Sequence, residues 1–313
     1  MTESQERKTG DPVKGLATTP FFSVIIPTYN RSDLLREAIR SVLAQTFQDF
    51  EVIIVNDFSS EDILSVVKEF RDERLRYLLN QRCKGVSGAR NTGIFAANGA
   101  WTAFLDSDDE WNSNKLHLVR ERIRKIDQDT GVVYTGYVIY DFIKRHQLSV
   151  HVPHKDGWIQ DDLLYSNYIG TFSVVSIRSD LLKAVGGCDE RFCYMEDGDL
   201  YVRLAGLSKV ASINEPLTYV RTQNRDRLSF HMGKRVDAFE FFLVKHETLF
   251  QRNHRARHRF AALIFLYEIK QGEWRKAAKK LPWTMAGIFL DMPNFVKTLW
   301  GIALTVIKPE RIE

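Results

Sequence analysis

The sequence predicts an α/β fold built on a mostly parallel, doubly wound sheet, and three observations lead to that prediction. Short apolar runs rich in β-branched residues alternate with stretches of helical period. Polar motifs follow the ends of these runs, as expected where ligands bind beyond the carboxyl ends of parallel strands. The chain has 313 residues, which suits one large α/β unit with appendages.

Four expected strands and three expected helices alternate in the first third of the chain. We predict buried strands at residues 21–26, 51–55, 74–79 and 100–105. Apolar residues at helical spacing predict helices at residues 34–43, 59–70 and 87–98. Ser32 or Asp33 is expected to cap the first helix. Ser59 or Ser60 is expected to cap the second helix, and Gly99 to close the third.

The pattern becomes mixed α and β in the next part of the chain and helical at its end. A helix and two strands are expected there in order, at residues 116–126, 132–140 and 171–177. From about Lys234 onward the segments have helical period, with Pro282 and Pro293 expected as breaks. We therefore place a domain boundary near Ser229.

Composition indicates an ordinary folded protein rather than a disordered or membrane-embedded one. Hydrophobic residues make up 44% of the chain and charged residues 27%. Cys83, Cys188 and Cys193 have neither the even number of a disulfide framework nor the spacing of a zinc site, which indicates reduced thiols. Residues 1–19 are polar and lack the apolar core of a signal peptide, so we expect a flexible tail on a cytoplasmic protein.

The net charge of +4 is small, but basic residues crowd residues 252–280. This patch is either a solvated helix surface or a contact for an anionic neighbour, and no nucleic-acid motif accompanies it. Residues 283–307 are apolar and aromatic, but charged residues and a proline interrupt them, so they are not expected to span a bilayer. They are expected either to lie in a membrane interface or to pack on the main domain.

Three carboxylates, Asp106, Asp108 and Asp109, occur within four residues at the end of the fourth expected strand. Their mutual repulsion is unfavourable unless a cation neutralises it. Mg²⁺ and Mn²⁺ take oxygen ligands, typically one or two carboxylates together with substrate phosphates. The cluster therefore favours a metal-diphosphate site, although the same acids are compatible with capping the next helix.

Polar side chains also follow the other expected strands, on the edge of the sheet where the acids lie. Tyr29 is suited to covering a nucleobase, and Asp57 to accepting hydrogen bonds from base N–H groups. Arg90 is suited to pairing with phosphate or to holding the acids in place. Each also has a structural interpretation: Tyr29 in packing, Asp57 in an Asx turn with Ser59, and Arg90 on a helix surface.

Together and in this order, these motifs resemble those of the family 2 glycosyltransferases of the GT-A fold. The resemblance covers about residues 21–221 and lies in FSVIIPTYNR (22–31), QTF (45–47), VND (55–57), GARN (88–91) and FLDSDD (104–109). It implies a GT-A domain at residues 20–229, followed by a C-terminal helical region at residues 230–313. Within the domain it implies a nucleotide-binding half (20–112) and a mixed α+β acceptor-binding half (113–229).

The same resemblance implies a set of site residues for a nucleotide-sugar donor. The residues implied to line the nucleotide site are Pro27, Tyr29, Asn30, Asp57, Arg90 and Asp106. Residues 106–108 correspond to the family's DXD motif, in which Asp108 and Asp106 hold Mn²⁺ or Mg²⁺ against the diphosphate. Asp108 is the first expected metal ligand.

A second acidic group, MEDGDL at residues 195–200, opens another expected helix, where acids often serve only as caps. By resemblance it is the family's E-D motif. Asp197 is then the expected general base that removes the acceptor proton, with Glu196 as the alternative. A single displacement with the base on the face opposite the leaving group inverts the anomeric configuration.

The chain departs from the family pattern at two places. Asn56 stands where relatives often carry an acid, which leaves Asp57 as the acid of that pair. After the last strand of the domain, where many relatives carry a histidine, this chain has Gln223, and Arg225 or Arg227 is expected to serve the phosphate instead. The sequence has no Q-x-x-R-W motif, which indicates a non-processive enzyme.

The leading hypothesis is an inverting, metal-dependent glycosyltransferase of cell-surface glycan or polysaccharide biosynthesis. Its expected partners are a nucleotide-sugar donor and a glycan or lipid-linked acceptor, with peripheral membrane contact through the C-terminal region at the cytoplasmic face. A nucleotidyltransferase is an alternative, disfavoured because residues 27–31 contain no glycine. A catalytically silent nucleotide-sugar binding or scaffold protein is another, disfavoured because Asp106, Asp108 and Asp197 are intact.

Overall fold

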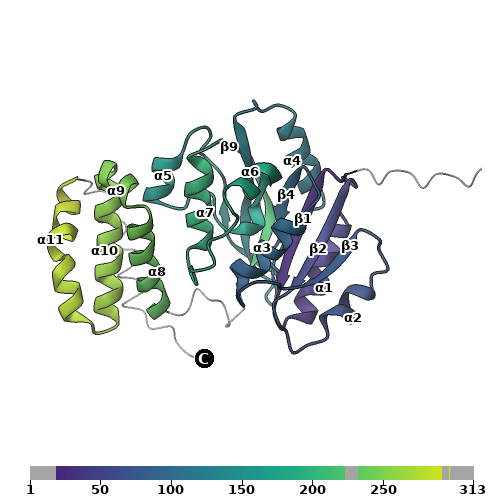
Figure 1. Cartoon of the computed structure of the whole chain (residues 1–313), viewed down its shortest axis with the longest axis horizontal. Coiled ribbons are helices and arrows are strands. Elements are labelled where there is room, and N and C mark those ends of the chain that lie inside the picture. Colours follow the sequence, from purple (N-terminus) through teal and green to yellow (C-terminus); the bar gives the residue numbers. More distant parts are fainter. Residues whose placement is uncertain (1–18, 223–231, 291–295, 297–313) are drawn as a thin grey trace, which may run out of the picture.

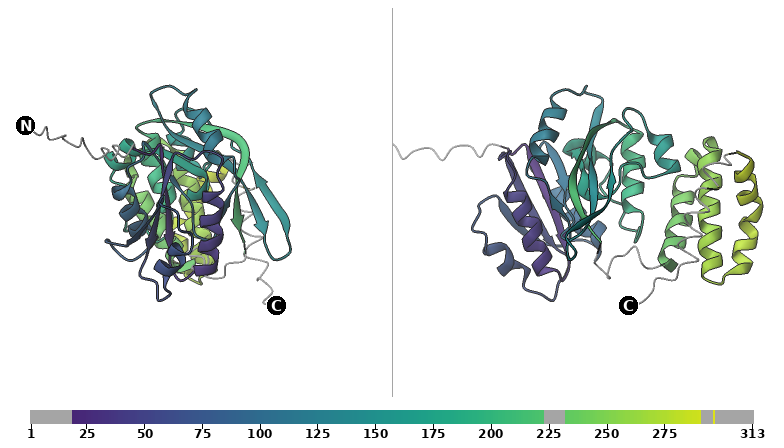
Figure 2. Two further views of the ribbon diagram at one scale, coloured as in Figure 1. Left: turned by 90° about the vertical axis from the view of Figure 1, so that its right-hand side faces the viewer. Right: turned by 180° about the vertical axis from the view of Figure 1, so that it is seen from behind.

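The computed structural model describes residues 19–222, 232–290 and 296, and shows one sheet covered by helices with further helices beside it (Figures 1 and 2). The strands are β1 (Phe22–Thr28), β2 (Phe50–Asn56), β3 (Leu75–Leu79), β4 (Trp101–Phe104), β5 (Glu110–Trp111), β6 (Thr130–Asp141), β7 (His146–His151), β8 (Val175–Arg178) and β9 (Lys209–Arg221). The helices of the main unit are α1 (Ser32–Leu43), α2 (Ile63–Lys68), α3 (Val86–Ala96), α4 (Lys115–Ile123), α5 (Gln160–Tyr165), the 3₁₀ turn η1 (Phe172–Val174), α6 (Ser179–Ala184) and α7 (Glu196–Ala205). The later helices are α8 (Met232–Lys245), α9 (Glu247–Arg252), α10 (His254–Lys270) and α11 (Trp274–Leu290).

The first four strands form the parallel part of the sheet, as the sequence predicted. β1 lies between β2 and β4, and β3 pairs with β2, all in parallel register. Alternate residues face opposite sides: Ile25 and Ile53 join the core under α3, whereas Val24 and Val52 join the core under α1 and α2. Because both faces are covered, the carboxyl ends of the strands are the edge where a ligand can bind.

The second part of the sheet is mixed. β8 pairs antiparallel with both β4 and β6, and β9 pairs parallel with β6. The short strands β5 and β7 pair antiparallel with β9 and β6, respectively, and neither was predicted from the sequence. This part places η1 beside the carboxyl end of β4, where Ser173 Oγ accepts from the Asp106 N–H, and Arg90 links Asp106 to Glu196 at the beginning of α7.

The helix caps differ from those predicted, because other contacts engage the predicted residues. α1 begins at Ser32, whose backbone N–H donates to Glu61 Oε2 at 2.9 Å, and Asp33 lies inside the first turn without capping it. Asp62, rather than either predicted serine, caps α2. The two serines instead bond to Asn30, in the loop after β1. The loops after β1 and β2 are therefore tied together.

Two other predictions of local structure were wrong. Residues 171–177 were predicted as a strand, but they begin with η1, because the Thr171 side chain accepts a hydrogen bond from the Ser173 backbone N–H. Pro282 was predicted to break a helix, but it lies inside α11. The hydrogen bond that a proline removes is offset by packing of α11 along α10. Pro293 and Ser229 lie outside the described residues.

The C-terminal helices share a core with the main unit. Phe239 and Phe242 of α8 and Phe260 of α10 belong to the same buried cluster as Phe172 and Tyr201. None of the helices in the described part of the chain is long and apolar enough to cross a membrane. The predicted tail at residues 1–19 is described only at Thr19.

A buried ionic network joins α7 to α8. Asp199, which is 0% exposed, contacts Arg203 Nη2 at 2.7 Å, Lys245 Nζ at 2.6 Å and His246 Nε2 at 2.9 Å. Burial raises the pKa of this carboxyl, but its interactions with His246, Arg203 and Lys245 outweigh burial, and the pKa is held below its usual value. The network fixes the position of α7 from the side of the C-terminal helices.

We predict that Asp199→Asn lowers the free energy of unfolding by about 3 kcal/mol, because it leaves buried cationic groups without their counter-charge. Urea denaturation monitored by circular dichroism measures the change. Glu240→Gln is the matched control. Glu240 of α8 pairs with Lys280 of α11 at 2.8 Å in a partly exposed position, so its loss should lower the free energy of unfolding by less than about 1 kcal/mol. Equal effects of the two substitutions would contradict a stabilising role for the network.

Candidate active site

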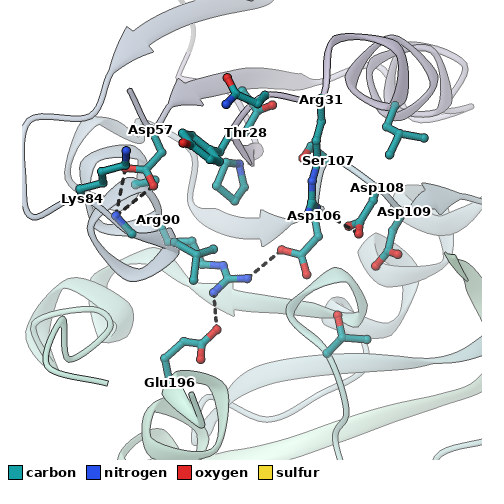
Figure 3. Close-up of a pocket in the computed structure, with 18 of the residues that line it drawn as sticks. Thr28, Arg31, Asp57, Lys84, Arg90, Asp106, Ser107, Asp108, Asp109 and Glu196 are labelled. Carbon is teal, nitrogen blue, oxygen red and sulfur yellow. Dashed lines mark hydrogen bonds and ion pairs between the residues drawn. The ribbon is translucent and has the colours of Figure 1, made fainter. Parts of the chain in front are cut away.

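A cavity of about 910 Å³ opens at the carboxyl ends of β1, β2 and β4 (Figure 3). Its size is within the range of pockets that bind small molecules and cofactors. Nine site residues predicted from the sequence line it: Pro27, Tyr29, Asn30, Asp57, Arg90, Asp106, Asp108, Glu196 and Asp197. These residues come from two distant parts of the chain, and the mixed part of the sheet brings them together.

The loops after β1 and β2 form one end of the cavity. Asp57 accepts hydrogen bonds from the Gly85 backbone N–H at 2.9 Å and from Asn80 Nδ2 at 2.7 Å, so its carboxylate is fixed in place. Asp57 makes no Asx turn, because Asn56 Oδ1 accepts the Ser59 N–H instead. The carboxylate is therefore held at the cavity wall by the loop before α3.

Tyr29 does not pack in the core, since it is 45% exposed at the same end of the cavity. The ammonium group of Lys84 lies 4.7 Å from the centre of its ring. Figure 3 shows Lys84 and Asp57 side by side there. An aromatic face, a fixed carboxylate and a lysine can together contact a nucleobase and its sugar.

Arg90 lies at the centre of the site and is not on a helix surface. It is 3% exposed, and its guanidinium carbon is 3.8 Å from the centre of the Phe172 ring. One Nη donates to Asp106 at 2.7 Å and the other to Glu196 at 2.9 Å (Figure 3). Burial opposes the charge, but Asp106 and Glu196 outweigh it and raise the pKa of Arg90 above its already high value.

The loop after β4, residues 106–109, is called the acid loop. It does not cap α4, whose N-cap is Asn114. Asp108 pairs with Arg31 Nη1 at 3.1 Å, and Asp109 accepts a hydrogen bond from Ser173 Oγ at 2.7 Å. Ser173 Oγ also accepts from the Asp106 N–H at 3.0 Å. One hydroxyl of η1 therefore binds both ends of the acid loop.

Asp106 and Asp108 both face the cavity, and their oxygens suit a hard divalent cation. Among the described residues, no group of three or more His, Cys, Asp or Glu side chains could hold a metal ion by itself. A cation here would therefore need further ligands from phosphate and water, as is usual for Mg²⁺. The hydroxyl of Thr28, buried in the cavity wall, has no hydrogen-bond partner within the described part of the chain and is available to a ligand.

Asp197 lies at the start of α7 and faces the cavity. Burial, and then the charge of Glu196, raise its pKa to about 7. Its Oδ2 accepts a hydrogen bond from Asn167 Nδ2 at 3.0 Å. Met195, the residue just before α7, has φ 69°. This left-handed conformation is strained for a long side chain and directs the chain into the helix. Glu196 pairs with Arg90, whereas the neighbouring Asp197 accepts hydrogen bonds from the Asn167 amide and the Gly198 backbone N–H.

Sequence reasoning missed three residues that order the site: Arg31, Asn167 and Ser173. Arg31 belongs to the recognised PTYNR motif, which was the only available signal. Asn167 and Ser173 lie in irregular segments with no motif, and their partners are distant in sequence. Gln223, Arg225 and Arg227 lie outside the described residues, so the predicted phosphate contact at these positions is not tested.

Arg221, at the end of β9, reaches the acid loop. Its backbone N–H donates to Asp109 Oδ1 at 3.2 Å, and its Nε donates to the Asp108 carbonyl oxygen at 3.2 Å. Its guanidinium also pairs with Glu110 at 3.0 Å and with Glu37. β9 therefore supports the acid loop at Asp108 and Asp109, whereas Arg90 holds it at Asp106.

Comparison with known proteins places this site in a family. The family model described as glycosyl transferase family 2 matches residues 23–181. The UDP-Glc:alpha-D-GlcNAc-diphosphoundecaprenol beta-1,3-glucosyltransferase WfgD of Escherichia coli is 44% identical over 192 residues, which cover 61% of this chain and 72% of the relative. The GalNAc(5)-diNAcBac-PP-undecaprenol beta-1,3-glucosyltransferase of Campylobacter jejuni is 43% identical over 106 residues, which cover 33% of this chain and 34% of the relative.

Solved structures confirm the fold. The mannosyltransferase PcManGT from Pyrobaculum calidifontis, solved in complex with GDP-Man and Mn²⁺, superposes with a TM-score of 0.61 at 18% identity. The match covers 94% of this chain and 83% of that one. The chain therefore belongs to glycosyl transferase family 2 and is a glycosyltransferase of the GT-A fold, as its strand-end motifs predicted.

Proposed function

We propose that this glycosyltransferase moves a hexose from a UDP-sugar to a hydroxyl of a lipid-linked glycan, with inversion at the anomeric carbon. One observation carries the proposal: a single cavity is lined by Tyr29 and Asp57, by Asp106 and Asp108 of the acid loop, and by Asp197, a carboxylate with a raised pKa. The names of the two relatives, which act on diphosphoundecaprenol-linked sugars, support the substrate class. The proposed role is in surface glycan biosynthesis.

In the proposed reaction, Asp197 removes the proton from the acceptor hydroxyl, and the resulting oxygen attacks the anomeric carbon of the donor. The bond from that carbon to the diphosphate oxygen breaks, so the nucleoside diphosphate leaves with the bonding electron pair. Inversion follows because attack and departure occur on opposite faces of the sugar. Arg90 does not move a proton, since two carboxylates hold it charged; it keeps the acid loop and α7 in register.

Mn²⁺ or Mg²⁺, held by Asp108 and Asp106, would supply positive charge that stabilises the departing diphosphate. The metal-bound neighbour PcManGT supports this part of the proposal by fold alone. Arg31, beside Asp108, can contribute a fixed positive charge to the same diphosphate. The chain's own residues therefore provide both ligands and a cation at one end of the acid loop.

We predict that Asp108→Asn abolishes metal-dependent binding of UDP, because it removes a charged ligand while keeping the shape of the side chain. For the wild type, UDP at a hundred times its Kd in the presence of Mn²⁺ should stabilise the fold by about 2.7 kcal/mol, seen as a rise in Tm. Asp180→Asn, at an exposed pair with Arg178, is the control and should keep the full rise. A panel of UDP, GDP, dTDP and CMP identifies the carrier. No stabilisation of the wild type by any of them would favour the silent-scaffold alternative.

We predict that Asp197→Asn keeps metal-dependent UDP binding but lowers the transfer rate by about 10² to 10⁴, the usual contribution of a general base. Release of UDP in the presence of an acceptor measures the rate. Glu196→Gln is the comparison: it should also weaken the fixation of Arg90, so donor binding should fall together with turnover. Normal turnover of Asp197→Asn would show that the base is a different residue.

The pH dependence of the wild type gives a second readout of the same base. Asp197 is active as a base only when ionised, and its pKa is about 7. We therefore expect kcat/KM to rise about tenfold per pH unit below pH 7 and to level off above it. A flat profile across this range would contradict the assignment.

We also propose that α11 contacts a membrane surface. Its exposed residues include Trp274 (65%) and Leu281 (45%), flanked by exposed Arg275, Lys276 and Lys279. Tryptophan together with cations is typical of helices that lie in the headgroup region of anionic membranes. α11 forms the outer edge of the C-terminal helices, on the side away from the sheet (Figure 2). Such a contact would bring a lipid-linked acceptor to the enzyme.

We predict that the protein sediments with phosphatidylglycerol vesicles and much less with phosphatidylcholine vesicles, and that high salt releases it. Trp274→Glu should reduce the bound fraction severalfold, because it removes the apolar anchor and adds a repelled charge. Trp158→Glu, at another exposed tryptophan (58%), is the control and should bind like the wild type. Equal binding of both variants would rule out α11 as the contact.

A further inference from the structure

A second cavity, of about 340 Å³, lies between β6, β7 and the loop before η1. Aromatic rings form much of its wall. Tyr137 of β6 and His151 of β7 stack with their ring centres 4.4 Å apart and their planes 10° apart. His154 meets the ring of Tyr168 edge to face, at 5.4 Å. The cavity thus has a flat aromatic wall and imidazole and phenol groups that can exchange hydrogen bonds.

This second cavity adjoins the proposed general base. Asn167 lines it and also donates a hydrogen bond to Asp197 Oδ2 at 3.0 Å. Gly170 lines it too, whereas the next residue, Thr171, lines the first cavity. One short loop therefore separates the two cavities, and a molecule in the second cavity lies next to the carboxylate that must take the acceptor proton.

The loop is held rigidly against the aromatic wall. Asn167 Oδ1 accepts the Gly170 N–H at 2.8 Å, and Asn167 Nδ2 donates to the Gly170 carbonyl at 3.0 Å. Gly170 has φ 104°, and a Cβ there would lie 2.9 Å from the Tyr137 ring. The glycine thus lets the loop adopt this turn directly beside Tyr137, so the aromatic wall and the base have fixed relative positions.

The lining of the second cavity carries little charge. None of the described residues that line it is a lysine, arginine, aspartate or glutamate. This distinguishes it from the first cavity, whose acids and cations suit a diphosphate. A neutral pyranose has a face of C–H groups, which packs on an aromatic ring, and hydroxyl groups, which bind to imidazole, phenol and amide groups.

We propose that this second cavity is the acceptor-sugar subsite: it binds a neutral sugar ring of the acceptor glycan against the stacked pair of Tyr137 and His151. The inference rests on the proposed glycosyltransfer and names where the acceptor binds. Asn167 is then a positioning residue that orients Asp197 toward the bound acceptor. The diphosphate and lipid of a lipid-linked acceptor extend beyond this subsite.

Two exposed residues of β7 allow a matched test. Val150 lines the second cavity and is 42% exposed, whereas Leu148, two residues earlier, is 53% exposed and does not line it. Val150→Trp fills the subsite, so the KM for the acceptor should rise at least tenfold while hydrolysis of the donor in the absence of acceptor stays unchanged. Leu148→Trp adds the same bulk outside the cavity and should keep the wild-type KM.

A second pair of variants tests the aromatic wall. Tyr137→Ala should raise the KM for the acceptor about tenfold, the usual contribution of an aromatic contact, whereas Tyr137→Phe keeps the ring and should have a much smaller effect. Both should keep Mn²⁺-dependent thermal stabilisation by UDP, which shows that they fold. The probes are UDP-glucose, with a panel of p-nitrophenyl glycosides and a short-chain alkyl GlcNAc diphosphate as acceptors.

The outcomes separate this inference from the proposed function. If Val150→Trp and Tyr137→Ala keep the wild-type KM for the acceptor, the cavity is not the subsite. If the wild type hydrolyses UDP-glucose but transfers to no sugar in the panel, the assignment of the cavity to a sugar ring is likewise overturned. If the wild type neither binds UDP nor hydrolyses any nucleotide sugar, the proposed function is wrong and the subsite falls with it.

Discussion

The buried guanidinium of Arg90 is the interaction on which the rest of the site depends. It is contributed by α3 of the parallel part, and it binds Asp106, at the end of β4, and Glu196, at the start of α7. Removing this buried cation would leave two partly buried carboxylates without their counter-charge, which is destabilising. The guanidinium thus holds the acid loop and the start of α7 at a fixed distance from each other. The ring of Phe172, in η1, lies over the guanidinium with its centre 3.8 Å from the guanidinium carbon.

The mixed part of the sheet also helps to hold the acid loop and α7 in place. β8 runs antiparallel beside β4, and the turn η1 before it delivers Ser173 to the acid loop. The buried network at Asp199 also fixes α7, through Lys245 at the end of α8 and His246 just after it. α7 is therefore held at its N-terminal end by Arg90 and on its buried face by the C-terminal helices. An added helical region can thus affect catalysis without contacting a substrate.

The sequence allowed the parallel half, the sheet edge with its motifs and nine of the residues that line the cavity to be predicted, because these features are local. Buried strands are continuous apolar runs, and the polar residues that follow them must meet at one edge. Ser173 and Asn167 could not be found in this way, since their roles arise from partners that are distant along the chain. The caps of α1 and α2 were missed for the same reason: Glu61 binds Ser32 across two loops. Local preference predicts which residues can cap a helix, and tertiary contacts decide which one does.

The charges around Asp197 connect donor binding to the basicity of the proposed base. Burial and the charges of Glu196 and Asp106 raise the pKa of Asp197, whereas Arg90 lowers it. Asp106 and Glu196 are also the two partners of Arg90. The charges of Arg90, Asp106 and Glu196 therefore both hold the acid loop and set the affinity of Asp197 for a proton. Any ligand that neutralises Asp106 removes one of the negative charges that stabilise the protonated form of Asp197. A divalent cation bound at Asp106 would therefore make the proposed base easier to ionise, and donor binding would in this way promote removal of the acceptor proton.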